Sequence, residues 1–139
     1  MLLIIYSILI GYMIFFTICI APIINSTLDR ENASKLLRKV FPRNFLFGLV
    51  LSILAILVSF ILEQNTSLII AIFLTCLFIL NLYYIMPKIN TISDKDKKRK
   101  QYSKSFKKLH LFSVVLYLLK MLASITVSYT HLRAHETSR

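Results

Sequence analysis

The hydrophobic positions of the chain fall into four long apolar runs, which cover residues 2–24, 45–62, 68–86 and 106–126. A helix rises about 1.5 Å per residue, so each run can cross a hydrocarbon layer of about 30 Å. A cleaved signal peptide is the alternative for the first run, but no basic residue precedes it. The pattern therefore predicts an all-α fold, a membrane-embedded four-helix bundle.

The polar segment between the first two runs has a different periodicity. Its apolar residues follow the i, i+3, i+4, i+7, i+8 spacing of one helical face, at Ala33, Leu36, Leu37, Val40 and Phe41. Ser26 and Asp29 have the spacing of a capping box, and Pro42 would end the helix. We expect a short amphipathic cytoplasmic helix over 26–41, lying either in the membrane interface or against the bundle.

Basic residues mark one side of the predicted bundle. Of the 17 Lys and Arg residues, five lie between the first two runs and nine lie between the third run and the first turn of the fourth, Lys107 and Lys108 included, whereas the connection 63–67 has none. By the positive-inside rule, both basic connections are cytoplasmic, and the N-terminus and 63–67 lie outside. We expect a multi-pass protein of the cell (inner) membrane whose basic loops contact anionic lipid headgroups, with no binding of nucleic acid.

The composition excludes several other classes of protein. Hydrophobic residues make up 57% of the chain and charged residues 17%, with a mean hydropathy of +0.71 and a net charge of +11. A water-soluble domain has about 25% charged residues, and a disordered chain is poor in apolar ones. Cys19 and Cys76 both lie inside apolar runs, so we predict neither a disulfide framework nor a Cys-x-x-Cys metal site.

The end of the chain differs from the rest. Residues 127–139 contain no Ile, Lys, Asn or Phe, and the run VSYTHLRAHET matches one reading frame of a transposase sequencing adapter. We interpret 127–139 as a sequencing-adapter scar that packs against nothing, and 1–126 as the four-span domain. A native polar tail is the alternative. In the first case His131 and His135 do not belong to the protein, and the native C-terminus is not in this sequence.

Small residues form stripes on the first two predicted spans. In the second span they recur at i, i+4, i+7 and i+11, at Gly48, Ser52, Ala55 and Ser59. In the first span Ser7 and Gly11 have the same spacing. Small residues let helix backbones approach closely in lipid. We therefore expect the first and second spans to face one another through these stripes.

The motifs of common enzyme classes are missing from the sequence. There is no His-Glu-x-x-His, Gly-x-Ser-x-Gly or phosphate-binding glycine loop. We therefore predict no enzymatic activity, no cofactor and no metal site. Lys120 is the one charge that lies more than a turn inside an apolar run. We expect it to extend toward the outer headgroups, with pairing to Glu63 or the lining of a pathway as alternatives.

A few polar residues lie one to two turns inside the predicted cytoplasmic interface. Asn81 is near the end of the third run, and His110 and Ser113 share one face of the fourth. Pro22 lies at a similar level in the first run, where its missing N–H leaves a carbonyl free. Because unpaired polar groups are costly in lipid, we predict that these residues turn inward and meet. They would form either a structural clamp or a binding or proton-handling site.

The order of several short motifs resembles a known family. These are Gly11 with Phe15 and Phe16, AP at 21–22, ASKLL at 33–37, FPR at 41–43, NLYYIMP at 81–87, and Phe106, His110 and Ser113. In this order and spacing the chain is similar to the four-span membrane proteins typified by transmembrane protein 205. The resemblance implies a fold and a membrane location, but no biochemical activity.

Two functional hypotheses follow from these patterns. The first is a small membrane helper or interaction protein that uses its helix faces to bind itself or another membrane protein. The alternative is a transporter or tolerance factor for a small solute or a soft metal, using Cys19, Cys76 and His110. A polar cavity inside the bundle would favour the alternative.

Overall fold

The computed structural model describes residues 1–96 and 103–137, with side chains as far as Thr130 and at Arg133, and every regular element in this part of the chain is helical. The elements are α1 (Leu2–Phe15), η1 (Phe16–Ile20), α2 (Ala21–Thr27), α3 (Arg30–Ile61), α4 (Asn65–Leu80), η2 (Asn81–Ile85), α5 (Met86–Lys95) and α6 (Lys104–Thr137), where η1 and η2 are π-helical. This architecture confirms the all-α prediction.

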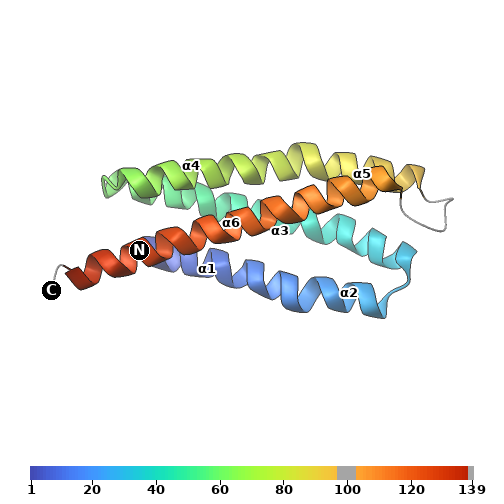
Figure 1. The fold of residues 1–139 in the computed structure, drawn as a ribbon, viewed down its shortest axis with the longest axis horizontal. Coiled ribbons are helices and arrows are strands. Elements are labelled where there is room, and N and C mark those ends of the chain that lie inside the picture. Colours follow the sequence, from blue (N-terminus) through green and yellow to red (C-terminus); the bar gives the residue numbers. More distant parts are fainter. Residues whose placement is uncertain (97–102, 138–139) are drawn as a thin grey trace.

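The elements join into four long rods that lie side by side (Figure 1). Within the described residues the rods Leu2–Thr27, Arg30–Ile61, Asn65–Lys95 and Lys104–Thr130 are each long and apolar enough to cross a membrane. Figure 1 shows that the α2–α3 connection, the end of α5 and the start of α6 lie at one end of the bundle. We call it the basic end, since Arg30, Arg38, Lys95 and Lys104 are on the adjoining helix ends. Residues 97–100, which hold four further predicted loop cations, lie outside the described residues.

The second and third rods form the predicted antiparallel hairpin. Its turn is a Schellman-type cap, in which Gln64 N–H donates to the Ser59 carbonyl at 3.0 Å and Glu63 N–H to the Phe60 carbonyl at 3.2 Å. Glu63 adopts the left-handed conformation with φ of 52°. These bonds satisfy carbonyl groups at the end of α3, so the chain can reverse within three residues before α4 begins.

The short amphipathic helix expected over 26–41 is not a separate element. The α3 helix starts at Arg30 and continues through Pro42 to Ile61. Its N-cap is Asp29, and not Ser26, because the Asp29 carboxylate accepts hydrogen bonds from the backbone N–H groups of Glu31 and Asn32 at 3.2 and 3.3 Å. Hydrogen bonds from Asn32, its side chain first, lower the pKa of the Asp29 carboxyl.

Proline therefore does not end α3, contrary to the expectation from the sequence. Pro42 removes one backbone donor, but Phe41 and Phe45 on either side of it pack into the bundle core. Their rings stack with centroids 6.0 Å apart. Packing on both sides of the proline holds the two halves in one helix, since neighbouring helices can stabilise a rod that proline alone would interrupt.

Two other prolines coincide with changes in helix type. Pro22 and Pro87 each lie two residues after the end of a π-helical segment. At both places the N–H of the residue before proline donates to a carbonyl five residues back, from Ala21 to Phe16 and from Met86 to Asn81. Such a π-bulge relieves the crowding between the proline ring and the preceding turn, so the first and third rods continue past their prolines.

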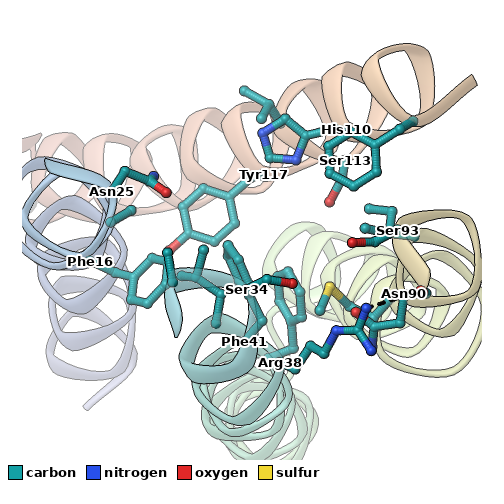
Figure 2. A pocket seen from close by; sticks show the side chains of 18 of the residues that line it. Phe16, Asn25, Ser34, Arg38, Phe41, Asn90, Ser93, His110, Ser113 and Tyr117 are labelled. Atoms are coloured by element: carbon teal, nitrogen blue, oxygen red, sulfur yellow. Dashed lines mark hydrogen bonds between the residues drawn. The ribbon is translucent and has the colours of Figure 1, made fainter. Parts of the chain in front are cut away.

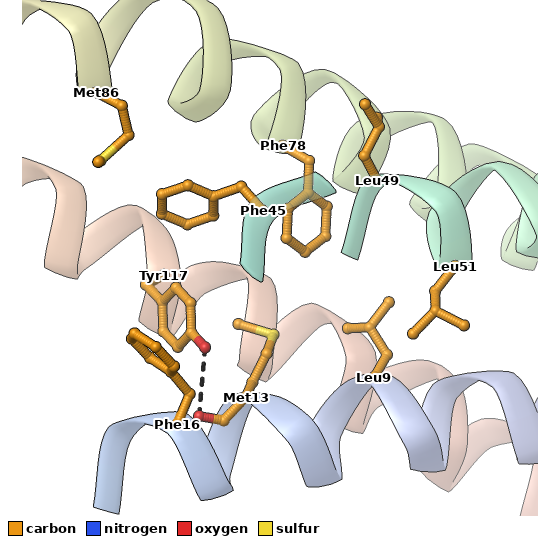
Figure 3. Close-up of a cluster of buried hydrophobic side chains, with 9 residues drawn as sticks. All are labelled: Leu9, Met13, Phe16, Phe45, Leu49, Leu51, Phe78, Met86 and Tyr117. Carbon is orange, nitrogen blue, oxygen red and sulfur yellow. Dashed lines mark hydrogen bonds between the residues drawn. The ribbon is translucent and has the colours of Figure 1, made fainter. Parts of the chain in front are cut away.

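The core combines aromatic and aliphatic side chains from all four rods (Figure 3). Its largest cluster contains Leu9, Met13, Phe16, Phe45, Leu49, Leu51, Phe78, Met86 and Tyr117. Tyr117 on α6 donates a hydrogen bond to the Met13 carbonyl on α1 at 3.3 Å, as the dashed line in Figure 3 marks. This bond links the first and fourth rods across the bundle.

The small-residue stripe of α3 is buried and packs against both α4 and α1, since Gly48 contacts Tyr12 and Ala55 clusters with Leu2 and Tyr6. Ser52 accepts a hydrogen bond from Thr75 on α4 at 3.0 Å, so the stripe packs against the third rod. Gly48 lies where α1, α3 and α4 meet, against Tyr12 and Phe78. Ser7 and Gly11 are exposed on the outer side of α1, and nothing lies near Gly11. The expectation that they face α3 is therefore wrong.

The tail was expected to pack against nothing, and this is wrong at its first residue. Val127 is buried in a cluster with Leu2, Tyr6 and Ala55. The reason is helical register, because α6 continues past residue 126 and places position 127 on the inward face one turn after Ser124. Tyr129 is exposed. The side chains of His131 and His135 lie outside the described part of the chain.

Candidate functional site

A cavity of about 500 Å³ opens within the basic end of the bundle (Figure 2). Its walls come from all four rods. The apolar part of the lining combines aromatic and aliphatic side chains and includes Phe16, Phe41, Phe45, Met86, Phe106 and Tyr117. The polar part includes Asn25, Ser34, Arg38, Asn90, Ser93, His110 and Ser113. The cavity is therefore amphipathic, with polar and apolar side chains in one lining.

Arg38 holds one side of the cavity in place. Its guanidinium forms a two-pronged ion pair with Asp94 on α5, with N···O distances of 2.8 and 3.0 Å. It also donates to the Asn90 carbonyl at 3.3 Å. Planar, bidentate pairs of this type fix geometry better than a single contact. The pair thus fastens α3 to α5 beside the cavity.

Two members of the predicted polar cluster meet directly. Asn81 is fully buried, and its side-chain oxygen accepts a hydrogen bond from the Ser113 hydroxyl at 3.1 Å. Its amide group donates to the Leu77 carbonyl at 3.2 Å. Asn81 therefore joins the third rod to the fourth, and Ser113 also reaches the cavity lining.

The other two predicted members do not join that hydrogen bond. His110 lines the cavity one turn before Ser113. Its ring stacks on that of Phe106, with the two ring centroids 5.9 Å apart. Pro22 is exposed, and its neighbour Ala21 contributes to the cavity lining instead. The predicted cluster is thus divided into a buried Asn81–Ser113 pair and a cavity-lining histidine.

Lys120 is the feature that sequence reasoning placed wrongly. Its side chain is fully buried and does not extend toward the bundle surface. Its Nζ atom lies 4.2 Å from the ring centroid of Phe78, 4.6 Å from that of Phe45 and 5.4 Å from that of Tyr117. Within the described chain no hydrogen-bond partner reaches Nζ. We call these three rings the aromatic cage.

The inward position of Lys120 follows from the register of α6. Ser113, Tyr117, Lys120 and Ser124 recur at i, i+4, i+7 and i+11, so they occupy one helical face. Tyr117, Lys120 and Ser124 are buried. That polar spacing in an otherwise apolar span was visible in the sequence and could have placed Lys120 inside the bundle.

Two rings separate the cavity from the buried lysine. Phe45 and Tyr117 line the cavity and also belong to the aromatic cage around Nζ. Their ring centroids are 6.2 Å apart. The Phe45–Tyr117 pair therefore forms the inner wall of the cavity, with the Lys120 Nζ atom behind it.

The two cysteines lie apart from this site. Cys19 is half-buried and Cys76 is exposed. Among the described residues no three His, Cys, Asp or Glu side chains lie close enough to hold a metal ion together. Neither cysteine lines the cavity.

Comparison with known proteins identifies the family. Residues 4–98 match the model of a family described as a domain of unknown function (DUF4149), and this match covers more than half of the chain. The chain therefore belongs to that family. No curated protein and no solved structure gives a match. The matched region contains α1 to α5 and ends before α6 begins.

Proposed function

We propose that this member of the DUF4149 family is a multi-pass protein of the cell (inner) membrane that holds a small amphipathic organic molecule between its helices. It would act as a membrane helper that binds a ligand and catalyses no reaction. The observation that supports the proposal is the cavity of about 500 Å³ at the basic end. Cavities of roughly 300–1,000 Å³ with apolar walls and a few polar groups are typical of small-molecule sites.

The chemistry of the lining favours an amphipathic occupant. Phe16, Phe41 and Phe106 offer apolar surface for a hydrocarbon or aromatic body. Asn90, Ser93 and His110 offer hydrogen-bonding groups for a polar end. A molecule with both parts would bury its apolar surface and satisfy its polar group in the same site.

Transport of a small solute through the bundle is the second candidate. It is favoured by Lys120, because ionisable residues inside membrane spans often mark solute pathways. A solute would have to pass Phe45 and Tyr117, whose rings form the inner wall. We therefore favour binding over transport, and nothing at Cys19 or Cys76 favours a soft metal.

We also propose the orientation and partners that the charge pattern indicates. The basic connections would be cytoplasmic and contact anionic headgroups, with the α3–α4 turn outside. Further copies or another membrane protein could bind the outer helix faces, and we propose no nucleic-acid partner. The similarity to the transmembrane protein 205 family, which rests on motif order, supports the same arrangement.

Thiol labelling tests this orientation. In a variant with Cys19→Ala and Cys76→Ala, single cysteines are introduced as Asn65→Cys at the α3–α4 turn or Lys95→Cys at the basic end, both at exposed positions. An impermeant maleimide should label only the Asn65→Cys protein in intact cells, and both proteins after the cells are permeabilised. Labelling of Lys95→Cys alone in intact cells would reverse the orientation.

Native mass spectrometry tests the proposed binding function. The protein is purified in detergent from the membranes in which it was made, and the detergent is removed in the gas phase. Its measured mass should then exceed the mass of the chain by that of a small bound molecule, the bound mass. Ser34→Trp should abolish this mass because Ser34 lines the cavity and an indole would fill it. Ile53→Trp, on the exposed face of the same helix, is the matched control and should keep the bound mass. Equal occupancy in both variants would refute binding in the cavity.

A further inference from the structure

Lys120 is a buried lysine for which the described residues supply no anion. Its exposed fraction is 0%, and its Nζ atom makes no hydrogen bond or ion pair within the described chain. Ionisable side chains inside membrane spans usually pair with one another or with backbone carbonyls. Lys120 has instead three aromatic rings around its ammonium group.

The aromatic cage stabilises the charge without neutralising it. The faces of aromatic rings carry partial negative charge, and a desolvated ammonium over them is attracted by the ring quadrupoles. The rings add no formal negative charge, so the field of the ammonium extends beyond them. In the low-dielectric interior of a bundle this field is screened less than it would be in water.

The cavity is a space in which this field can act on a ligand. Phe45 contributes to the cavity lining, and its ring centroid is 4.6 Å from Nζ. A ligand group in contact with the cavity side of that ring would lie about 8 Å from Nζ, allowing a van der Waals separation of about 3.5 Å. At an effective dielectric constant of about 20, the attraction between two opposite unit charges at that distance would strengthen the binding of an anionic ligand by roughly tenfold or more over a neutral one.

We propose that Lys120 makes the cavity selective for organic anions, and that its ligand is a carboxylate on an apolar body of fatty-acid type. This inference rests on the proposed binding function and specifies the class of ligand. The anionic group would lie against the Phe45–Tyr117 wall, where the charge of Lys120 acts through the rings.

Two arginines, Arg30 and Arg38, also line the cavity. The charge of Arg38 is already balanced. Its guanidinium pairs with Asp94 and also donates to the Asn90 carbonyl. An anion near Arg38 would also meet the carboxylate of Asp94. Arg30 is the first residue of α3 and belongs to the open end of the bundle, whereas Lys120 lies behind the Phe45–Tyr117 wall. Selectivity for an anion at this wall is therefore assigned to Lys120, and Arg30→Met and Arg38→Met serve as the comparisons.

Three ligands of equal chain length test the proposal. Decanoate, decanol and decylammonium share a ten-carbon chain and differ in the charge of the head. Native mass spectrometry measures the fraction of protein that carries each molecule at equal concentration. The wild-type protein should bind decanoate roughly tenfold more tightly than decanol, and decylammonium most weakly. In Lys120→Met the decanoate preference should be lost while decanol binding is retained, whereas Arg30→Met and Arg38→Met should keep most of the preference.

The outcomes separate this inference from the proposed function. If none of the three molecules binds the wild-type protein, the cavity is not a ligand site of this kind and both proposals fail. If decanoate and decanol bind equally, or if Lys120→Met keeps the decanoate preference, binding stands and the role of Lys120 is overturned. Decanol binding reports whether Lys120→Met folds. Should it not fold, the order of the three ligands on the wild-type protein and on Lys120→Arg, which keeps the charge, decides the proposal.

Discussion

Replacing Gly48 by alanine should destabilise the bundle by about 1–3 kcal/mol. A Cβ atom added at this position would overlap the Tyr12 hydroxyl and the edge of the Phe78 ring. Phe78 is fully buried at the meeting point of three rods, so its ring has little room to move. Gly48→Leu should be worse and should prevent α1 and α4 from packing on α3 together.

Gly11→Ala is the matched control for this substitution. Nothing lies within 4 Å of a Cβ atom at Gly11, and both glycines are in helices of the same bundle. Alanine favours the helix over glycine, so this variant should be as stable as the wild type or slightly more so. Thermal unfolding in detergent, followed by circular dichroism, measures both effects. Equal melting temperatures for the two variants would show that Gly48 is not a close-packing position.

Replacing Lys120 by glutamate should cost about 3 kcal/mol or more at neutral pH. The variant would place a carboxylate against the negative faces of the three cage rings. The carboxylate would lose its hydration and gain no donor to replace it. Much of the loss should be recovered at acidic pH, where the carboxyl group is protonated and neutral.

Lys120→Met isolates the effect of charge from that of shape. Methionine is unbranched and apolar, and it can fill much of the volume of the lysine side chain. We expect its thermal stability to stay near that of the wild type, because removing a buried charge also removes its desolvation cost. If the glutamate and methionine variants were equally stable at neutral pH, the ammonium would not lie inside the aromatic cage.

The sequence predicted the rods of this fold well and their junctions less well. Four apolar runs were sufficient for four helices, because only a helix satisfies its own backbone within a hydrophobic run of that length. Pro42 misled the prediction, since a proline ends most helices when tertiary contacts are unknown. The packing of Phe41 and Phe45 that carries α3 past it is a tertiary effect and has no local signal.

The candidate site was only partly visible in the sequence for a similar reason. Periodicity placed Ser113 and His110 on one face, and the cost of unpaired polar groups brought Asn81 to Ser113. The cavity is the space that the side chains of all four rods leave unfilled between them. Because it depends on the packing of four distant segments, no single segment of the sequence predicts it. A lysine near a span end usually reaches the headgroups, which favours a surface position for Lys120, whereas the buried Tyr117 and Ser124 on the same face of α6 mark the inward position that it adopts.

Photolabelling is the measurement that tests ligand binding in the cavity most directly. A ten-carbon carboxylic acid carrying a diazirine is bound to the purified protein, activated by light, and located by peptide sequencing. The account predicts that labels concentrate on cavity residues such as Phe41, Phe106 and Val114, and that they disappear from these positions in Ser34→Trp but not in Ile53→Trp. Labels confined to outward-facing residues such as Ile69 and Phe60, and unchanged by Ser34→Trp, would contradict it.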